Sequence, residues 1–269
     1  MMHFLSIHWD PSLGIELGPF TIRYYSLMFV ISFGFGFQLM KKIFIAEKID
    51  LEKLDKLFMY TVIATILGAR LGHVFFYDWD YFKNHLAEIL LPVKFEPTFR
   101  FTGFAGLASH GAAVGIITSL YFYSKNILNK PLLYVLDRLG IIVPLAGFFI
   151  RIGNLMNSEI VGKPTEGTFG FIFVRLGEDF PRHPTQLYEA FSYLIIFFVM
   201  WRLYWKTDKK EQQGYLFGVF FATLWAVRFF VEFLKEAQIE SRDAWFLNTG
   251  QLLSIPLVLL GLFFVFRKK

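Results

Sequence analysis

Cysteine is absent from the 269 residues of this chain. This absence excludes structural disulfides, a thiolate nucleophile supplied by the chain itself, and a metal site with cysteine ligands. Any thiol that takes part in its chemistry must therefore come from a partner. Charged residues are also scarce, at 18% of the chain, which is below the roughly 25% of ordinary soluble domains.

Signatures of common cofactors are missing too. The six histidines are scattered, without the His-Glu-x-x-His spacing of a zinc site, and no Walker loop or dinucleotide-binding fingerprint is found. We therefore expect no metal and no cofactor. The net charge of +5 does not require a nucleic acid, because the cytoplasmic loops of membrane proteins are basic, and we expect no nucleic-acid partner.

Apolar residues dominate what is present: 55% of the chain is hydrophobic, and phenylalanine alone occurs 35 times. A membrane-spanning helix needs about 20 largely apolar residues. The sequence therefore predicts an all-α integral membrane protein, with one polytopic domain over residues 1–269 and a bundle of seven transmembrane helices. The predicted spans are 24–40, 57–77, 103–123, 132–150, 184–201, 215–234 and 248–266.

The segment ahead of the first predicted span, residues 1–20, contains Asp10, Glu16 and two prolines but no basic start or continuous apolar core. This composition favours an extramembrane or interfacial segment over a cleaved signal peptide.

The distribution of lysine and arginine predicts the orientation of the bundle. Basic residues are dense in the short segments after the first, third, fifth and seventh spans, and sparser in the longer segments between. Because basic loops remain in the cytoplasm, the N-terminus is expected outside and the C-terminus inside. The long loops at 78–102 and 155–183 then face outward.

Residues 151–162 form the most informative run, with Arg151, Asn154, Asn157, Glu159 and Gly162 following an apolar stretch. An arginine within a membrane costs roughly 2.5–3.5 kcal/mol on insertion scales. Arg151 alone is explained by an arginine that extends its charge to the membrane surface ahead of an ordinary polar loop. The amides, carboxylate and glycine that accompany it favour a functional site.

The third predicted span contributes His110, the only histidine in that span. Histidine titrates near neutral pH and can act as a general base. A structural histidine that is hydrogen-bonded across the bundle is the alternative. Ser109 cannot form a hydrolase dyad with His110, because neighbours on a helix point about 100° apart.

Two further predicted spans carry ionisable groups. Arg228 and Glu232 are four residues apart, so their side chains share a helix face within pairing distance. Such a pair either locks the bundle or orients an arginine towards an anionic ligand such as a phosphate. His183 precedes the fifth span, where Gln186 and Glu189 share a face. Glu189 needs a partner at this depth, although helix capping and interfacial anchoring explain much of the motif.

Several other polar residues are assigned to structure. Arg70 and His73 lie three apart in the second span, and Asp137 and Arg138 lie near the cytoplasmic end of the fourth. Tyr25, at the start of the first span, is typical of an interfacial aromatic belt.

Taken together, five motifs in order along nearly the whole chain resemble the prolipoprotein diacylglyceryl transferase family. They occupy residues 106–111, 151–162, 183–189, 228–232 and 250–256. The resemblance implies a multi-pass protein of the bacterial inner (cytoplasmic) membrane. Family members move the diacylglyceryl group of phosphatidylglycerol to the lipobox cysteine of a prolipoprotein signal peptide, forming a thioether and releasing glycerol phosphate. This is the first step of bacterial lipoprotein maturation.

The resemblance also implies roles for individual residues. His110 is the expected base for the thiol, and Arg151 and Arg228 are expected to hold the phosphate and stabilise the leaving group. The expected substrate-binding and positioning residues are Tyr25, Asn154, Asn157, Glu159, Gly162, His183, Gln186, Glu189 and Glu232, with Glu232 orienting Arg228.

Two other classes of function remain as alternatives. A transporter or flippase for anionic lipid would use the same arginines without chemistry, but it would need access from both faces, and the candidates gather in the outer half. An intramembrane protease is disfavoured, because the sequence shows no serine dyad, metal motif or paired intramembrane aspartates.

Overall fold

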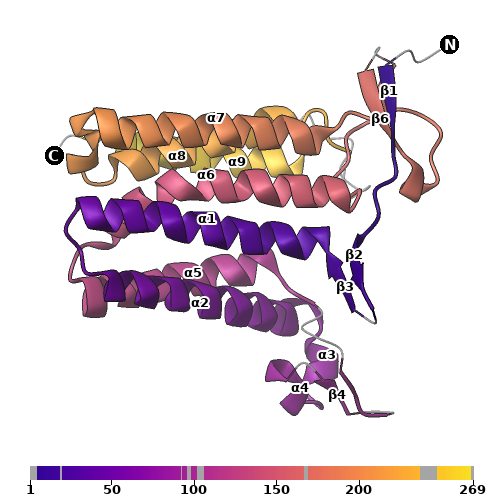
Figure 1. Ribbon diagram of the computed structural model, residues 1–269, viewed down its shortest axis with the longest axis horizontal. Helices are drawn as coiled ribbons and strands as arrows, with labels where there is room; N and C mark the ends of the chain where they lie inside the picture. The colour runs from indigo at the N-terminus through magenta and orange to yellow at the C-terminus, as the bar shows by residue number, and fades with distance from the viewer. Residues whose placement is uncertain are drawn as a thin grey trace. The chain divides into compact units, whose positions relative to one another are not determined.

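The computed structural model describes residues 5–18, 20–91, 93–95, 98–101, 106–166, 169–236 and 247–267. They divide into two compact units, each described by itself below (Figure 1). The first unit combines Met1–Met40 with Leu136–Lys269, and the second is Lys41–Val135.

Long apolar helices make up most of the described chain. Five are long and apolar enough to cross a membrane: α1 (Tyr24–Ala46), α2 (Leu51–Tyr77), α6 (Leu132–Met156), α7 (Thr185–Lys206) and α9 (Thr249–Phe266). Two further helices in predicted spans are shorter, α5 (Ser109–Tyr123) and the apolar α8 (Tyr215–Val231). The expectation of a mostly helical, multi-pass membrane protein is confirmed.

Short strands complete the fold, and the prediction of an all-α chain missed them. The described residues form three two-stranded sheets: parallel β1 (Leu5–Trp9) with β6 (Phe169–Phe173), antiparallel β2 (Gly14–Leu17) with β3 (Phe20–Arg23), and antiparallel β4 (Val93–Lys94) with β5 (Arg100–Phe101). The strands β1 and β6 lie far apart in the sequence, so their pairing leaves no local pattern to detect. The remaining short elements are α3 (Trp79–Phe82), α4 (Ala87–Leu90), η1 (Ser124–Leu128), η2 (Val174–Leu176) and η3 (Asp208–Glu211).

Several helix ends differ from the predicted spans. Helix α2 begins at Leu51, not at 57, because Asp50 caps it by accepting a 3.0 Å hydrogen bond from the Glu52 N–H. Its first turn is charged, so apolar patterning does not detect it. Helix α5 begins at Ser109, and residues 103–105 of that predicted span lie outside the described residues. Helix α6 continues to Met156, which places Arg151 inside a helix, not at its exit.

In the first unit, α8 contacts both α7 and α9. The carboxylate of Asp137 caps α8 by accepting hydrogen bonds from the N–H groups of Gly214 (2.7 Å) and Phe217 (2.8 Å). This contact agrees with the structural role predicted for Asp137. A capping carboxylate also interacts favourably with the positive end of the helix dipole.

The parallel sheet β1–β6 is attached to the end of α6. Phe171 and Phe173 of β6 form a buried cluster with Leu155, against which Trp9 packs. The indole N–H of Trp9 donates a 2.8 Å hydrogen bond to the Leu155 carbonyl. This attachment holds the chain in place directly after Arg151.

In the second unit, α2 and α5 cross at closely packed glycines. A Cβ atom added to Gly72 would lie 2.6 Å from the Cα atom of Gly111, and one added to Gly115 would lie 3.1 Å from the Cα atom of Gly68. Small residues of this kind let membrane helices approach closely enough for backbone packing.

We expect Gly72→Ala to destabilise the protein by about 1–3 kcal/mol, because the added methyl group would push the α5 backbone away. Gly34→Ala in α1 is the matched control, since a Cβ atom there meets nothing within 4 Å. Alanine favours a helix over glycine by about 1 kcal/mol, so the control should be neutral or more stable. Thermal unfolding in detergent measures both variants, and equal effects would contradict the close crossing.

A buried network organises the segment after α2. Arg70 donates hydrogen bonds to the backbone carbonyls of Ile89 (2.9 Å) and Glu88 (2.7 Å), which supports the structural role predicted for it. The Glu88 carboxylate accepts hydrogen bonds from the Phe95 N–H (2.8 Å) and the Tyr81 hydroxyl (2.7 Å). The Phe95 N–H above all, and then the Tyr81 hydroxyl, hold the pKa of Glu88 below its usual value.

A lowered pKa in the folded state means that Glu88 stabilises the fold above its unfolded pKa, and that this contribution disappears as pH falls through the folded pKa. We therefore expect the wild type to be more stable than Glu88→Gln near neutral pH. The difference should shrink as pH falls below about 4.3, because the unfolded chain, in which Glu88 has its ordinary pKa, then takes up a proton before the folded protein does. Melting temperatures of both proteins across pH test this expectation, and a difference that is independent of pH would contradict it.

Candidate functional site

Arg151 lies near the C-terminal end of α6 and faces the first turns of α7. Its Nε atom is 2.7 Å from Oε2 of Glu189, and the two side chains are 15% and 0% exposed. The geometry is that of an ion pair without an aligned hydrogen bond. The other carboxylate oxygen of Glu189 accepts a 2.9 Å hydrogen bond from Nζ of Lys235. Glu189 therefore has the partner that its depth requires, and it joins two cations.

The last turn of α6 and the loop after it extend this network. Oδ1 of Asn154 accepts a 3.1 Å hydrogen bond from Arg151, and the Asn154 amide donates to Glu159 Oε2 at 3.3 Å. The Asn157 amide donates to the other Glu159 oxygen at 3.1 Å, and Gln186 of α7 donates to the Glu159 backbone carbonyl at 2.7 Å. Every polar residue that the sequence singled out in this loop contributes to one connected arrangement.

Gly162 lies where three backbone segments meet. Its N–H donates a 3.0 Å hydrogen bond to the His183 carbonyl, and it forms an isolated bridge with Lys235. An added Cβ atom would collide with His183 and would lie 2.9 Å from the Leu234 carbonyl. The close approach at Gly162 is therefore made by the protein's own backbone. Nδ1 of His183 is 3.2 Å from the Tyr188 hydroxyl, which fixes the ring.

Arg228 and Glu232 do not form the predicted pair. Glu232 is instead 3.4 Å from Lys235, which follows it by three residues just past the end of α8. The guanidinium of Arg228 lies over the Trp225 ring, 5.3 Å from its centroid. Its Nε atom is buried without a hydrogen-bond partner, and within the described ranges no carboxylate pairs with it. Arg228 is thus a cation that is available to an anionic ligand.

Tyr25, at the start of α1, borders the same cluster. A Cβ atom added to Gly153 would lie 2.9 Å from Cδ2 of Tyr25, so the ring packs directly on α6. Its hydroxyl shares a hydrogen bond with Asn154. Tyr25 therefore belongs with Arg151 and Asn154, in addition to its place at the end of a helix.

Lys235 and Tyr193 of this cluster were not predicted from the sequence, whereas Gly250 begins the predicted motif at 250–256. Lys235 binds Glu189, and its spacing of three from Glu232 is the signal that could have revealed it. The Tyr193 hydroxyl donates a 3.4 Å hydrogen bond to Glu189. Gly250 approaches the Glu232 carboxylate so closely that a Cβ atom would lie 2.6 Å from it.

Arg182 was also missed, and it lies outside the spans. Its guanidinium pairs with Glu178 (2.5 Å) and Glu236 (3.0 Å) and donates to the Gly162 carbonyl at 3.1 Å. The hydrogen bond to Glu178 is the largest cause of a raised Arg182 pKa. These contacts hold the segment around Gly162 against the chain that follows α8.

His110 belongs to the second unit and is described there alone. It lies in the first turn of α5, and its side chain is exposed. Among the described residues of that unit, no hydrogen bond to its ring is found. His73 differs, because its ring packs against Gly106, whose φ of +75° and lack of a side chain leave room for it.

Comparison with known proteins identifies the family. Residues 12–267 match the sequence model of the prolipoprotein diacylglyceryl transferases. The chain belongs to this family. Similar proteins named phosphatidylglycerol–prolipoprotein diacylglyceryl transferase come from Bacteroides fragilis (43% identity, covering 97% of this chain and 95% of the relative) and Chloroherpeton thalassium (42%, covering 97% and 94%). A third, from Porphyromonas gingivalis, is 38% identical and covers 98% and 94%.

Membership of the transferase family confirms the resemblance that five short motifs indicated. Within the first unit, the motifs that contain Arg151, His183 and Arg228 come from three separate helices or loops. The structure brings the first two together around Glu189 and Gly162, and it adds Lys235 from the segment that follows Arg228. Two of the five motifs thus meet at one ionic cluster within the first unit.

Proposed function

We propose that this transferase moves the diacylglyceryl group of phosphatidylglycerol to the thiol of the lipobox cysteine of prolipoproteins, and that the cluster around Arg151, Glu189 and Arg228 binds the lipid headgroup. The relatives' names support both substrates. The observation that carries the proposed site is the Arg228 guanidinium, which has no acidic partner among the described residues, whereas Arg151 and Lys235 both pair with Glu189.

In the proposed reaction, the thiol sulfur attacks the terminal glycerol carbon that bears the phosphate. A carbon–sulfur bond forms, the carbon–oxygen bond breaks, and its electron pair leaves with glycerol phosphate. The thiol must lose its proton, because the thiolate is the nucleophile. The substrate supplies this thiol, in agreement with the absence of cysteine from the chain.

Each residue then has a proposed role. Arg228 and Arg151 stabilise the negative charge on the leaving phosphate, which is worth most where water is excluded. Glu189 and Asn154 hold Arg151, and His110 is the proposed base for the thiol. The remaining proposed binding or positioning residues are Tyr25, Asn157, Glu159, Gly162, His183, Gln186 and Glu232, with Glu232 acting on Lys235 and not on Arg228.

We further propose the topology that the basic residues predict: seven spans in one membrane domain, with α5 and α8 among them, the N-terminus outside and the C-terminus in the cytoplasm. The loops 78–102 and 155–183 then face outward. This arrangement places the Arg151 cluster in the outer half of the bacterial inner membrane, where a translocated prolipoprotein emerges.

Mass spectrometry of a lipobox peptide incubated with the purified protein and phosphatidylglycerol tests the function. We expect a diacylglyceryl mass gain on the cysteine with the wild type and none with Arg151→Ala. A folded wild-type protein that gives no gain would overturn the proposal and favour an anionic-lipid transporter.

A further inference from the structure

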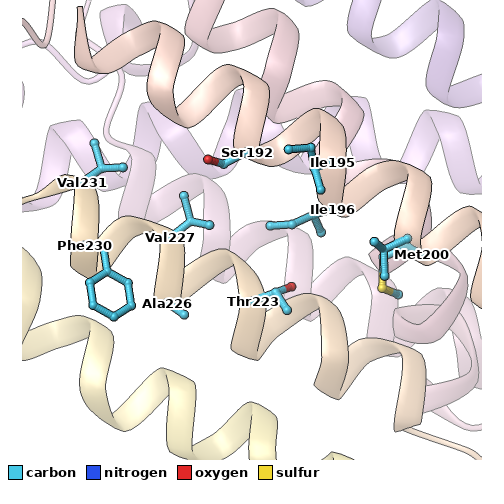
Figure 2. Close-up of a pocket in the computed structure, with 10 residues that line it drawn as sticks. Ser192, Ile195, Ile196, Met200, Thr223, Ala226, Val227, Phe230 and Val231 are labelled. Carbon is cyan, nitrogen blue, oxygen red and sulfur yellow. The ribbon is translucent and has the colours of Figure 1, made fainter. Parts of the chain in front are cut away.

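An apolar groove lies between α7 and α8 (Figure 2). Its volume is about 520 Å³, within the roughly 300–1,000 Å³ of small-molecule sites. Figure 2 shows side chains of both helices pointing into it. The lining includes Ser192, Ile196 and Met200 of α7, and Thr223, Val227 and Val231 of α8.

The lining offers a ligand almost no polar groups. The Ser192 hydroxyl donates a 2.7 Å hydrogen bond to the Tyr188 carbonyl, and the Thr223 hydroxyl donates one of 2.7 Å to the Val219 carbonyl. Among the residues that the structure describes, no charged side chain lines the groove. A hydrocarbon chain is therefore the ligand that matches it.

The burial pattern describes a slot that is open along one side. Met200 and Ile196 form its floor and are 0% and 7% exposed, whereas Ile195 and Phe230 on its rim are 64% and 66% exposed. In a membrane, these exposed rims face lipid. A chain can therefore enter from the bilayer without crossing a polar barrier.

The groove leads to the ionic cluster. Glu189 lies three residues before Ser192 on the same face of α7, and Lys235 follows Val231 by four residues. The Lys235–Glu189 contact at 2.9 Å joins the two helices just beyond this end of the groove. One end of the groove is thus ionic, and the rest is apolar.

The groove also has a suitable length. From Ser192 to Met200 the α7 axis rises by roughly 12 Å, at about 1.5 Å per residue. Half of a bilayer's hydrocarbon thickness is roughly 15 Å. The groove therefore accommodates much of one acyl chain that hangs from a headgroup at the cluster.

We infer that the α7–α8 groove binds one acyl chain of the anionic glycerophospholipid donor while its headgroup lies in the ionic cluster. This inference rests on the proposed function, which it deepens. Lipid tails are as apolar as the helix surface, so moving a chain from the bilayer into the groove provides little hydrophobic gain. Its effect is to orient the lipid so that the reactive glycerol carbon is held at the cluster.

The test uses phosphatidylglycerol with a photoreactive diazirine midway along one acyl chain, in vesicles of phosphatidylcholine that contain the full-length protein and no prolipoprotein. After illumination, we expect labelled peptides from 192–200 and 223–231, severalfold above those from α9. Phosphatidylcholine with the same diazirine should label α7, α8 and α9 alike. Equal labelling of the groove by both lipids would show that the groove contacts bilayer lipid without selecting phosphatidylglycerol, and it would overturn the inference.

Substitutions that fill the groove provide the second arm. Val227→Trp and Val199→Trp should each reduce groove labelling severalfold, whereas Val30→Trp in α1 should not. Val30 is a matched control because it is 67% exposed and does not line the groove. Two independent groove variants keep the test decisive if one of them fails to fold. Unchanged labelling in a folded groove variant would contradict the inference.

A parallel transfer assay with the lipobox peptide separates the two hypotheses. If the wild type transfers the diacylglyceryl group but the groove is not preferentially labelled, the proposed function is retained and only the inference about the groove is overturned. If the groove is preferentially labelled but no transfer occurs, the groove binds anionic lipid and the proposed transfer reaction is contradicted.

Discussion

Arg228→Gln is expected to reduce diacylglyceryl transfer by roughly 10²–10³-fold, the loss that follows removal of one donor to a developing negative charge. The same substitution should leave stability nearly unchanged. The guanidinium of Arg228 has no ion pair among the described residues, and its main contact is the Trp225 ring. Such a cation–π contact is worth only about 0.5–1 kcal/mol at an exposed site and about 2 when desolvated.

Measuring transfer activity and stability separately distinguishes a role of Arg228 in binding the lipid from a role in holding the bundle together. Transfer is followed by the mass gain of a lipobox peptide, and stability by thermal unfolding in the same detergent. Arg228→Lys is the informative companion, because it keeps the charge but loses the planar fork that suits phosphate, so it should recover only part of the activity. A large stability loss with a matching activity loss in Arg228→Gln would show that Arg228 supports the bundle instead.

The predictable part of the fold was its set of long apolar segments. Bilayer thickness demands about 20 apolar residues, and this requirement is local, so the sequence reveals it directly. The helix ends were less predictable. The charged first turn of α2 and the continuation of α6 past Arg151 depend on capping and on packing outside the apolar core. The pairing of β1 with β6 depends on contacts between distant residues and left no periodic trace.

In the candidate site too, local features were predictable from the sequence and contacts between distant residues were not. Arg151 and Glu189 drew attention because a charge at membrane depth is costly, and for Arg151 the accompanying amides, carboxylate and glycine favoured a functional site. Their partners were not predicted, because helix spacing favoured Arg228 for Glu232, whereas the turn after α8 brings Lys235 to both carboxylates. Short-range geometry predicts which residues share a helix face, but the end of a helix changes which of them meet.

Glu189→Gln should be the most destabilising conservative change in the site. The substitution keeps the shape of the side chain but removes the charge that Arg151 and Lys235 share. Glu189 is fully buried, and Lys235 is only 7% exposed at its side chain. Removing one member of a buried ion pair costs about 3–5 kcal/mol, because an uncompensated charge remains.

A double-mutant cycle tests this account of Glu189. Lys235→Gln alone should cost less than Glu189→Gln, because Glu189 keeps Arg151 as its partner. Combining the two substitutions should restore part of the stability lost in Glu189→Gln, since one of the two unpaired cations is then removed. Glu16→Gln in β2 makes the same chemical change at an exposed position and should have little effect. If Glu189→Gln unfolds at the wild-type temperature, or if the two effects simply add, Glu189 does not hold these cations together. Partial rescue would instead show that its charge is what joins α6 to the chain beyond α8.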